Sequence, residues 1–378
     1  MIACLSCNGG TVTRGERAAT KLFAATLEGV HCFERGSNTS SWSLGFTALP
    51  DLHISSLLWE PRNELLFAGA HGGGLWVSED SGRNWRSCRE GIGSDHVYTL
   101  ALQYRDEKVV LLAGTEPAAL YRSDDLGGSW RELGRLAGLP GSDKWTFPPP
   151  PHIAHVKNIA FHENEPETLY LCIEQGALLK STDDGETWFE QAGYVSDDDF
   201  FFKDNHRVLI TPSDAHRLYL CGGDGLYTSA DAGVSWKHLT TREDRIGYPD
   251  GMFLDPRDER TLYMFGPRSA PRTWGESGVS DATVLRSTDG GDHWEEIRSG
   301  LPDPVVGNIE ASGMYDAAGQ VTLFAGTATG EVFACETPGD PWYLIADGLP
   351  PISKGGHYRW FLTEAERAQV EARLRARG

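Results

Sequence analysis

The sequence predicts an all-β protein, a seven-bladed β-propeller of four-stranded blades that a C-terminal strand closes and a short C-terminal helix follows. The first observation behind this prediction is a repeated box, S-x-D-x-G-x-x-W. Its five intact copies begin at Ser78, Ser123, Ser181, Ser229 and Ser287, so successive boxes lie 45, 58, 48 and 58 residues apart. Periods of this size are typical of repeat architectures such as propellers.

The second observation is the order of short apolar runs around each box. In the first unit, LLFAGA (65–70) precedes a glycine turn, then GLWVSED, the box, and a run led by tryptophan, WRSC. One further run, SSLLW, lies ahead of them. Runs of this length joined by tight turns predict successive antiparallel strands. Four strands per unit make one propeller blade.

The third observation is a pair of degenerate copies. Cys335, Gly339 and Trp342 keep the frame of a box in which Thr337 replaces the aspartate, and Trp42 marks a worn copy near the start. The count is therefore seven blades. The N-terminal piece lacks a first strand, so we expect HYRWFL (357–362) to close the ring beside it.

The chain is predicted to be a single domain, residues 1–378. The propeller core is expected at about 20–362 and a C-terminal helix at about 363–377, where Thr363 and Glu366 form a capping-box pattern. A net charge of −20 with no basic stripe argues against nucleic acid and anionic lipid as partners. No apolar run is long enough to cross a bilayer, so no membrane partner is expected.

The cysteines and the start of the chain predict a cytoplasmic location. MIACLSCNGG lacks the basic start and apolar stretch of a secretory signal. The seven cysteines are scattered, and several lie in strand-like runs, which favours reduced, buried thiols. Cys4 and Cys7 form a lone C-x-x-C that we expect at a mobile terminus, without partners for a metal or redox role.

The repeated box resembles that of the Asp-box (BNR) repeat family, which includes sialidases, the sortilin ectodomain, xyloglucanases and photosystem II assembly-factor-like propellers. The resemblance covers about residues 20–362. It implies that each box lies on the turn between the third and outermost strands, away from the functional face. Because the family includes enzymes, receptors and assembly factors, the resemblance implies the fold more firmly than the function.

Histidines recur at the start of the predicted inner strands. Five of seven blades carry one at this position, while Tyr248 and Asn308 occupy it in the other two. These histidines are His53, His96, His155, His206 and His357. Inner strands surround the propeller axis, so the imidazoles are expected to converge there and bind a transition metal. A water-filled polar channel and a simply packed set of histidines are the alternatives.

Carboxylates and aromatic residues are predicted around the same axis. Loops between second and third strands, and positions two residues into the inner strands, supply carboxylates as partners, further ligands or acids: Glu28, Glu116, Glu174, Asp250 and Glu310. Three long segments, 134–152, 196–205 and 267–282, are expected to form lid loops over the axis. The predicted substrate pocket comprises His71, Trp145, Phe147, Phe200, Tyr248, Trp274 and Arg359.

Three functions remain open from these residues. The first hypothesis is a metal-dependent enzyme acting on a small organic substrate, with iron or copper for oxidative chemistry favoured slightly over zinc for hydrolysis. The second is a non-catalytic binding or assembly platform. The third is a glycoside hydrolase, which needs two carboxylates beside the scissile bond. Neither an Arg-Ile-Pro element nor an arginine trio of the sialidase type is found. Oligomeric state is not predicted.

Overall fold

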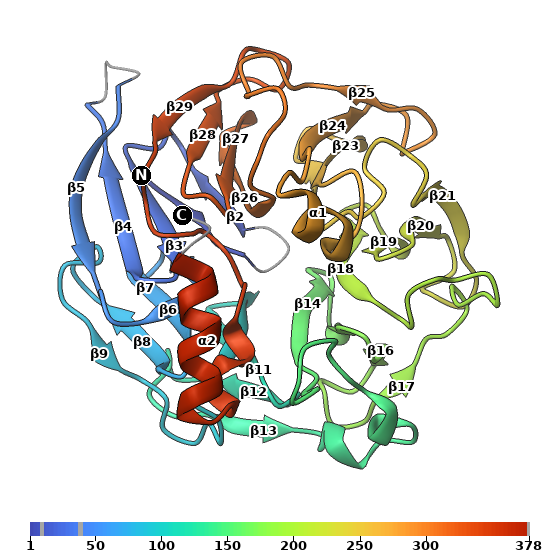
Figure 1. Ribbon diagram of the computed structural model, residues 1–378. Coiled ribbons are helices and arrows are strands. Elements are labelled where there is room, and N and C mark those ends of the chain that lie inside the picture. The colour runs from blue at the N-terminus through green and yellow to red at the C-terminus, as the bar shows by residue number, and fades with distance from the viewer. Residues whose placement is uncertain (8–10, 37–40, 376–378) are drawn as a thin grey trace.

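Seven β-sheets surround a central axis in the computed structural model, which describes residues 1–7, 11–36 and 41–375 (Figure 1). Six sheets have four strands and the seventh has five, so the predicted seven-bladed propeller is confirmed. Adjacent blades bury apolar side chains between them. Phe67 of one blade and Val97 and Tyr121 of the next, for example, belong to one core cluster. The core therefore follows the ring rather than filling its centre.

The blades are numbered 1 to 7 in chain order, and their strands run from the axis outward. Blades 1 to 4 contain, in turn, β1 (Ile2–Leu5), β3 (Lys21–Thr26), β4 (Gly29–Glu34), β5 (Ser43–Ala48); β6 (His53–Glu60), β7 (Leu65–His71), β8 (Gly74–Ser78), β9 (Arg86–Ser87); β10 (Val97–Arg105), β11 (Lys108–Thr115), β12 (Leu120–Ser123), β13 (Arg131–Leu133); β14 (Val156–His162), β15 (Glu165–Ile173), β16 (Ala177–Ser181), β17 (Phe189–Glu190). Blades 5 to 7 contain β18 (Asn205–Thr211), β19 (Asp214–Gly222), β20 (Gly225–Ser229), β21 (Lys237–Thr241); β22 (Gly251–Asp255), β23 (Asp258–Gly266), β24 (Thr283–Ser287), β25 (Glu295–Glu296); β2 (Thr11–Gly15), β26 (Ile309–Ala317), β27 (Gln320–Thr327), β28 (Val332–Cys335), β29 (Tyr343–Ala346).

The ring is closed by its first two strands. β1 is the inner strand of blade 1 and pairs in parallel with β3, while β2 pairs in parallel with β26 of blade 7. The prediction that residues 357–362 close the ring as a strand is wrong. Gly356 takes a left-handed backbone with φ of 71°, and His357–Phe361 then form a 3₁₀ helix, η3. The run IACL, buried at all four positions, supplies the missing strand instead.

The five boxes lie on the turns between the third and outermost strands, as the resemblance implied. In blade 4 the Ser181 hydroxyl accepts a hydrogen bond from the amide of Gly185 at 2.9 Å and donates one to Asp183 at 2.8 Å. Asp183 accepts a further bond from the amide of Thr187 at 2.9 Å. Gly185 has a φ of 87°, which a side chain would strain. Each box therefore fixes a turn on the outer part of its blade.

Acid should weaken these turns. In blade 5, hydrogen bonds from the hydroxyl and amide of Ser235, together with Ser229, lower the pKa of Asp231 to about 2. The unfolded value is about 3.9, so the carboxylate stabilises the fold above pH ~4 and this contribution is lost as the pH falls towards 2. We expect Asp231→Asn to lower Tm at pH 7 and to differ less from the wild type at pH 2.5. Thermal unfolding at both pH values measures this difference. Asp51→Asn, an exposed carboxylate outside the boxes, is the control and should change Tm little.

Two α-helices and three 3₁₀ helices complete the described chain. α1 (Pro271–Ser277) lies in the predicted lid segment 267–282, and η1 (Leu136–Gly138) and η2 (Ser142–Lys144) lie in segment 134–152. α2 (Glu364–Arg375) begins with the predicted capping box, in which the Thr363 amide donates to Glu366 at 3.0 Å. Residues 376–377 of the predicted helix lie outside the described residues. No helix in the described chain is both long and apolar enough to cross a membrane.

All seven cysteines are buried and none forms a disulfide, as predicted. The expected mobile terminus around Cys4 and Cys7 is wrong, because Cys4 lies in β1 and both side chains are about 1% exposed. Burial raises the pKa of both thiols, so these cysteines are unreactive core residues.

Candidate functional site

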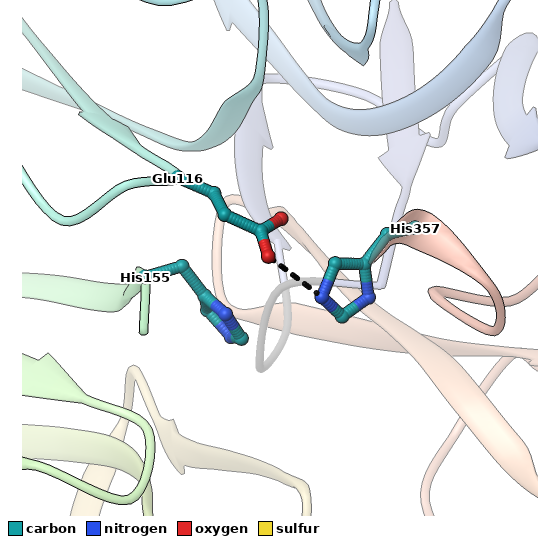
Figure 2. A group of neighbouring side chains, drawn as sticks. All are labelled: Glu116, His155 and His357. Carbon is teal, nitrogen blue, oxygen red and sulfur yellow. Dashed lines mark ion pairs between the residues drawn. The ribbon is translucent and has the colours of Figure 1, made fainter. Parts of the chain in front are cut away.

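The five predicted histidines are all buried at the inner ends of their blades or above them, but they do not form one ring of ligands. Only His155 and His357 share a group with ligand geometry. Together with Glu116, each offers one ligand atom, and these atoms lie within 4.8 Å of one another. Figure 2 shows the three side chains converging from separate segments of the chain. Glu116 follows β11, His155 precedes β14, and His357 begins η3.

Hydrogen bonds fix which nitrogen of each imidazole faces the centre of this group. His357 Nδ1 lies 2.9 Å from the carbonyl oxygen of Lys354, which only accepts, so Nδ1 carries the proton. His155 Nε2 lies 2.9 Å from Glu174 Oε2, and this carboxylate is ionised beside Lys157, so Nε2 carries the proton. The lone pairs are therefore on His357 Nε2 and His155 Nδ1. Neither nitrogen has a hydrogen-bond partner among the described residues.

The carboxylate of Glu116, like these two nitrogens, has no hydrogen-bond partner among the described residues. Both oxygens are buried without a hydrogen bond within the described chain, and Oε1 lies 3.4 Å from His357 Nε2. Burial raises the pKa of Glu116, but His357, His155 and His96 outweigh burial and lower it overall. Burial lowers the pKa of His155, against the opposing effect of Glu174. The hydrogen bonds thus leave His357 Nε2 and His155 Nδ1 available beside the Glu116 carboxylate, and imidazole nitrogens and carboxylates are both metal ligands.

Aromatic rings surround the group. Tyr98 stacks on His155 with ring centroids 3.8 Å apart, and Phe147 contacts the rings of His155 and His357 at 5.2 and 4.7 Å. His71 lies against His357 at 5.1 Å, and neither of its nitrogens has a hydrogen-bond partner within the described residues. Burial lowers the pKa of His71 well below the ordinary value. These rings exclude water from the ligand atoms.

The other three predicted ligands are held by different bonds. His53 donates from Nε2 to the Ser353 carbonyl at 2.9 Å and accepts at Nδ1 from Arg359 at 3.0 Å. His96 Nδ1 accepts from the amide of Gly72 at 3.0 Å. His206 donates from Nδ1 to the Pro249 carbonyl at 2.6 Å. The prediction was a pool of five histidines of which three or four bind one metal. Only His155 and His357 of this pool share a group with ligand geometry, because backbone and arginine partners orient the other three elsewhere.

A second group with ligand geometry contains Glu174, Asp204 and His206. Here Tyr248 donates to Asp204 at 2.7 Å, and Glu174 already pairs with Lys157 at 2.9 Å. Lysine thus supplies the positive charge that a metal would bring. The first group has no such cation bonded to it in the described residues.

The predicted carboxylates Glu174, Asp250 and Glu310 form a buried cluster with two lysines, and sequence reasoning missed the lysines. Lys157 is fully buried and contacts Glu174 at 2.9 Å and Asp250 at 3.2 Å. Lys354 contacts Asp250 at 3.3 Å and Glu174 at 3.7 Å. Burial raises the pKa of Asp250, but the two lysines outweigh it and lower the value to about 2. For Glu174 the same lysines hold the pKa well below its usual range.

The pKa of Glu310 shifts in the opposite direction to those of Asp250 and Glu174. Glu310 Oε2 accepts hydrogen bonds from the Ser353 hydroxyl at 2.8 Å and from the amide of Lys354 at 3.0 Å. Burial raises the pKa of Glu310, and these contacts do not offset it. A carboxyl group with a raised pKa therefore lies beside Asp250, whose pKa is lowered.

Residues 350–361, which we call the axial strap, cover the axis. The strap bonds to blades 1 and 7 through Leu27 N to Pro351 O and Ile352 N to Thr327 O, and it places Lys354 and His357 inside. Trp360 lies against Gly72 and Phe361 lies against His96. The sequence signal available for the strap was its pair of glycines, Gly355 and Gly356, before the histidine.

The remaining predicted residues divide into those on the axis and those away from it. Phe147, Tyr248, His71 and Arg359 lie on the axis, as described above. Glu28 is exposed and lies beside His31. Trp145 packs against Gly176. The ring of Phe200 is 71% exposed and is covered on one face by Arg242. The predictions of an axial role for Glu28 and a pocket role for Phe200 are wrong, because both side chains are exposed to solvent.

Trp274 lines a cavity of about 280 Å³ on the loop face between blades 6 and 7. The other lining residues are small or neutral: Gly278, Val306, Gly307, Asn308, Ala328 and Thr329. The indole N–H of Trp274 and the amide oxygen of Asn308 are buried without a hydrogen-bond partner among the described residues. This cavity offers an aromatic surface, a donor and an acceptor to a neutral ligand.

No known family model matches the chain. Two curated relatives are a xyloglucanase of Paenibacillus sp, 26% identical over 210 residues, and xyloglucanase Xgh74A of Acetivibrio thermocellus, 28% identical over 226 residues. The matches cover 48% and 50% of this chain but only 19% and 26% of the relatives. The chain thus spans about a fifth to a quarter of the length of these relatives.

Solved structures show the same fold. An ancestral GH74 enzyme superposes with a TM-score of 0.58 at 16% identity, covering 78% of this chain and 38% of the other. YCF48 bound to D1 peptide superposes with a TM-score of 0.56 at 14% identity, covering 88% and 94%. The relatives named as xyloglucanases are hydrolases, and no comparison points to oxidative chemistry. The seven-bladed propeller therefore has its sequence relatives among hydrolases.

Proposed function

We propose that this propeller is a glycan-directed hydrolase of the Asp-box repeat family, in which Glu310 donates a proton and Asp250 is the ionised partner. The observation that carries the proposal is that both carboxyl groups are buried and contact the same residue: the Lys354 amide bonds to Glu310 at 3.0 Å and its Nζ bonds to Asp250 at 3.3 Å. The pKa values of the two groups also shift in opposite directions. A pair of carboxyl groups whose pKa values are pushed apart is what acid-assisted glycoside hydrolysis requires. The hydrolase names of the sequence relatives support the reaction class.

The cavity beside the pair supports a sugar ring as ligand. Asn308, which lines the cavity, lies two residues before Glu310 at the entry to β26. A sugar ring stacks on an indole face and exchanges hydrogen bonds with amide and hydroxyl groups. Trp274, Asn308 and Thr329 supply these groups, and none of the described lining residues has a charged side chain.

In the described structure the axial strap covers the acid. Ser353 and Lys354 occupy the hydrogen bonds that Glu310 would offer to a substrate. Substrate therefore reaches the pair after this part of the strap moves. Lys354 would move with it, and the ionised Asp250 keeps a cation nearby because Lys157 remains at 3.2 Å.

Hydrolysis assays with the full chain test this function. We expect release of reducing ends from xyloglucan oligosaccharides or of the aryl group from an aryl glycoside panel. Glu310→Gln and Asp250→Asn should each lower kcat/KM at least about 100-fold, the usual contribution of acid–base groups. Glu60→Gln is the matched control, because Glu60 is also buried on an inner strand but bonds to Arg62 and Asn63 at the far end. No hydrolysis by the wild type, or equal loss in the control, would contradict the proposal.

A further inference from the structure

We propose that Glu116, His155 and His357 bind one divalent transition-metal ion, and that this ion fastens the axial strap to the ring. The proposal does not rest on the hydrolase function, because it uses none of the residues assigned to that reaction. Its evidence is the convergence of three buried ligand atoms that lie within 4.8 Å of one another.

The hydrogen bonds around the imidazoles prepare both for a metal. In metal sites a ligating histidine donates its other N–H to a carbonyl or carboxylate, which fixes the ring and its tautomer. His357 does so to the Lys354 carbonyl, and His155 does so to Glu174. The opposite nitrogens then present lone pairs toward the Glu116 carboxylate.

These lone pairs and the carboxylate would repel one another with nothing between them. A cation at the centre satisfies all three, and buried polar atoms in folded proteins are ordinarily satisfied. The other carboxylates of the axis have their cations already, since Lys157 and Lys354 contact Glu174 and Asp250. Neither lysine makes a described contact with Glu116. Lysines therefore neutralise Glu174 and Asp250, whereas the described neighbours of Glu116 within ligand distance are the imidazoles of His155 and His357.

The donor set selects the kind of ion. Two imidazole nitrogens and one carboxylate oxygen suit Zn²⁺ or Fe²⁺, whereas Mg²⁺ and Ca²⁺ prefer oxygen ligands alone. His71, whose ring lies 5.1 Å from that of His357 and whose nitrogens have no described partner, is the nearest further donor. Tyr98 and Phe147 exclude water from the site, which strengthens binding of a charged ion by its own ligands.

The ligands come from parts of the chain that meet only in the folded ring. Glu116 belongs to blade 3, His155 to blade 4, and His357 to the axial strap. Metal bound here joins two blades to the strap. Its removal should therefore loosen the strap while leaving the blades, whose strands are paired independently of it, in place.

Metal content of the full chain, purified without a histidine tag, is the first test. We expect about one equivalent of zinc or iron by elemental analysis. After removal by chelation, Zn²⁺ alone should rebind by calorimetry, and Co²⁺ alone should give visible absorption typical of low coordination. Glu116→Gln and His357→Gln should weaken Zn²⁺ binding more than about 100-fold, beyond the effect of losing an outer-shell partner. His162→Gln, a buried histidine at the far end of β14, is the control and should bind as the wild type does.

Hydrogen exchange on the wild type provides a readout that needs no variant. Chelation should speed amide exchange in residues 350–362 at least tenfold and leave β14 and β15 unchanged, and Zn²⁺ should restore protection. The proposal is overturned if the wild type holds no stoichiometric metal and binds Zn²⁺ no more tightly than Glu116→Gln. A proton shared by His357 and Glu116 would then explain their contact. Glycoside hydrolysis can fail or succeed independently of either result.

Discussion

Leu5→Asp is expected to abolish stable ring closure. Leu5 lies in β1, is completely buried, and packs in a core cluster with Leu22 of blade 1 and Phe324 of blade 7. An aspartate here places an unpaired charge between the two blades, and burying such a group costs several kcal/mol. We expect the free energy of unfolding to fall by more than about 4 kcal/mol, a loss that only the most damaging single substitutions cause. Urea unfolding followed by tryptophan fluorescence measures this change.

The control for this variant is Val12→Asp. Val12 lies in β2, the inner strand of blade 7, but its side chain is 39% exposed. The same substitution should change stability there by no more than about 1 kcal/mol. Similar losses in the two variants, or a stable Leu5→Asp protein, would show that β1 does not close the ring.

Lys157→Met is the second substitution with a large expected effect. Lys157 is fully buried between Glu174 and Asp250, at 2.9 and 3.2 Å. Methionine keeps the shape of the side chain but removes its charge. Lys354, at 3.7 Å from Glu174 and 3.3 Å from Asp250, would then be the only lysine described beside the two carboxylates. Removing one partner of a buried ion pair costs about 3–5 kcal/mol. Equilibrium unfolding in urea at pH 7 should report a loss of this size.

Lys237→Met is the matched control for this change. Lys237 pairs with Asp292 at 3.2 Å on the surface, where the two side chains are 69% and 59% exposed. Surface pairs contribute about 0–1 kcal/mol, so this variant should unfold close to the wild type. If Lys157→Met proves as harmless as the control, the buried carboxylates do not depend on Lys157 for their charge balance.

The sequence predicted those parts of the protein that repeat. The box at Ser181 recurs with Asp183 and Gly185 at fixed spacing because each blade needs the same turn, so five copies located the blades and their strands. β1 has no such signal. It is four residues long and pairs in parallel with β3, so no hairpin turn joins it to its partner strand. Its closing role was therefore assigned to residues 357–362, which have the alternation of a strand but follow a glycine in a left-handed conformation.

The candidate site was predicted in part for a similar reason. Repetition placed the histidines at the axis, and His155, His357 and Glu116 do meet there. Which nitrogen faces the centre depends on carbonyl groups such as those of Lys354 and Pro249. Every residue has a carbonyl, so no sequence pattern identifies these partners. Lys157 was overlooked because a lysine on an inner strand is ordinarily a solvated side chain, and only its carboxylate neighbours justify its burial.

The pairing of β2 with β26 has a consequence for how the protein is made. Thr11 lies opposite Gly313, so a ribosome must add about 300 further residues, on the order of 15 to 60 s of translation at about 5–20 residues per second, before the partner strand exists. Blades 2 to 6 complete their own hairpins as they emerge, whereas the first strands wait with apolar side chains uncovered. The ring can therefore close only after blade 7 has been made, and until then Leu5 of β1 lacks its neighbour Phe324.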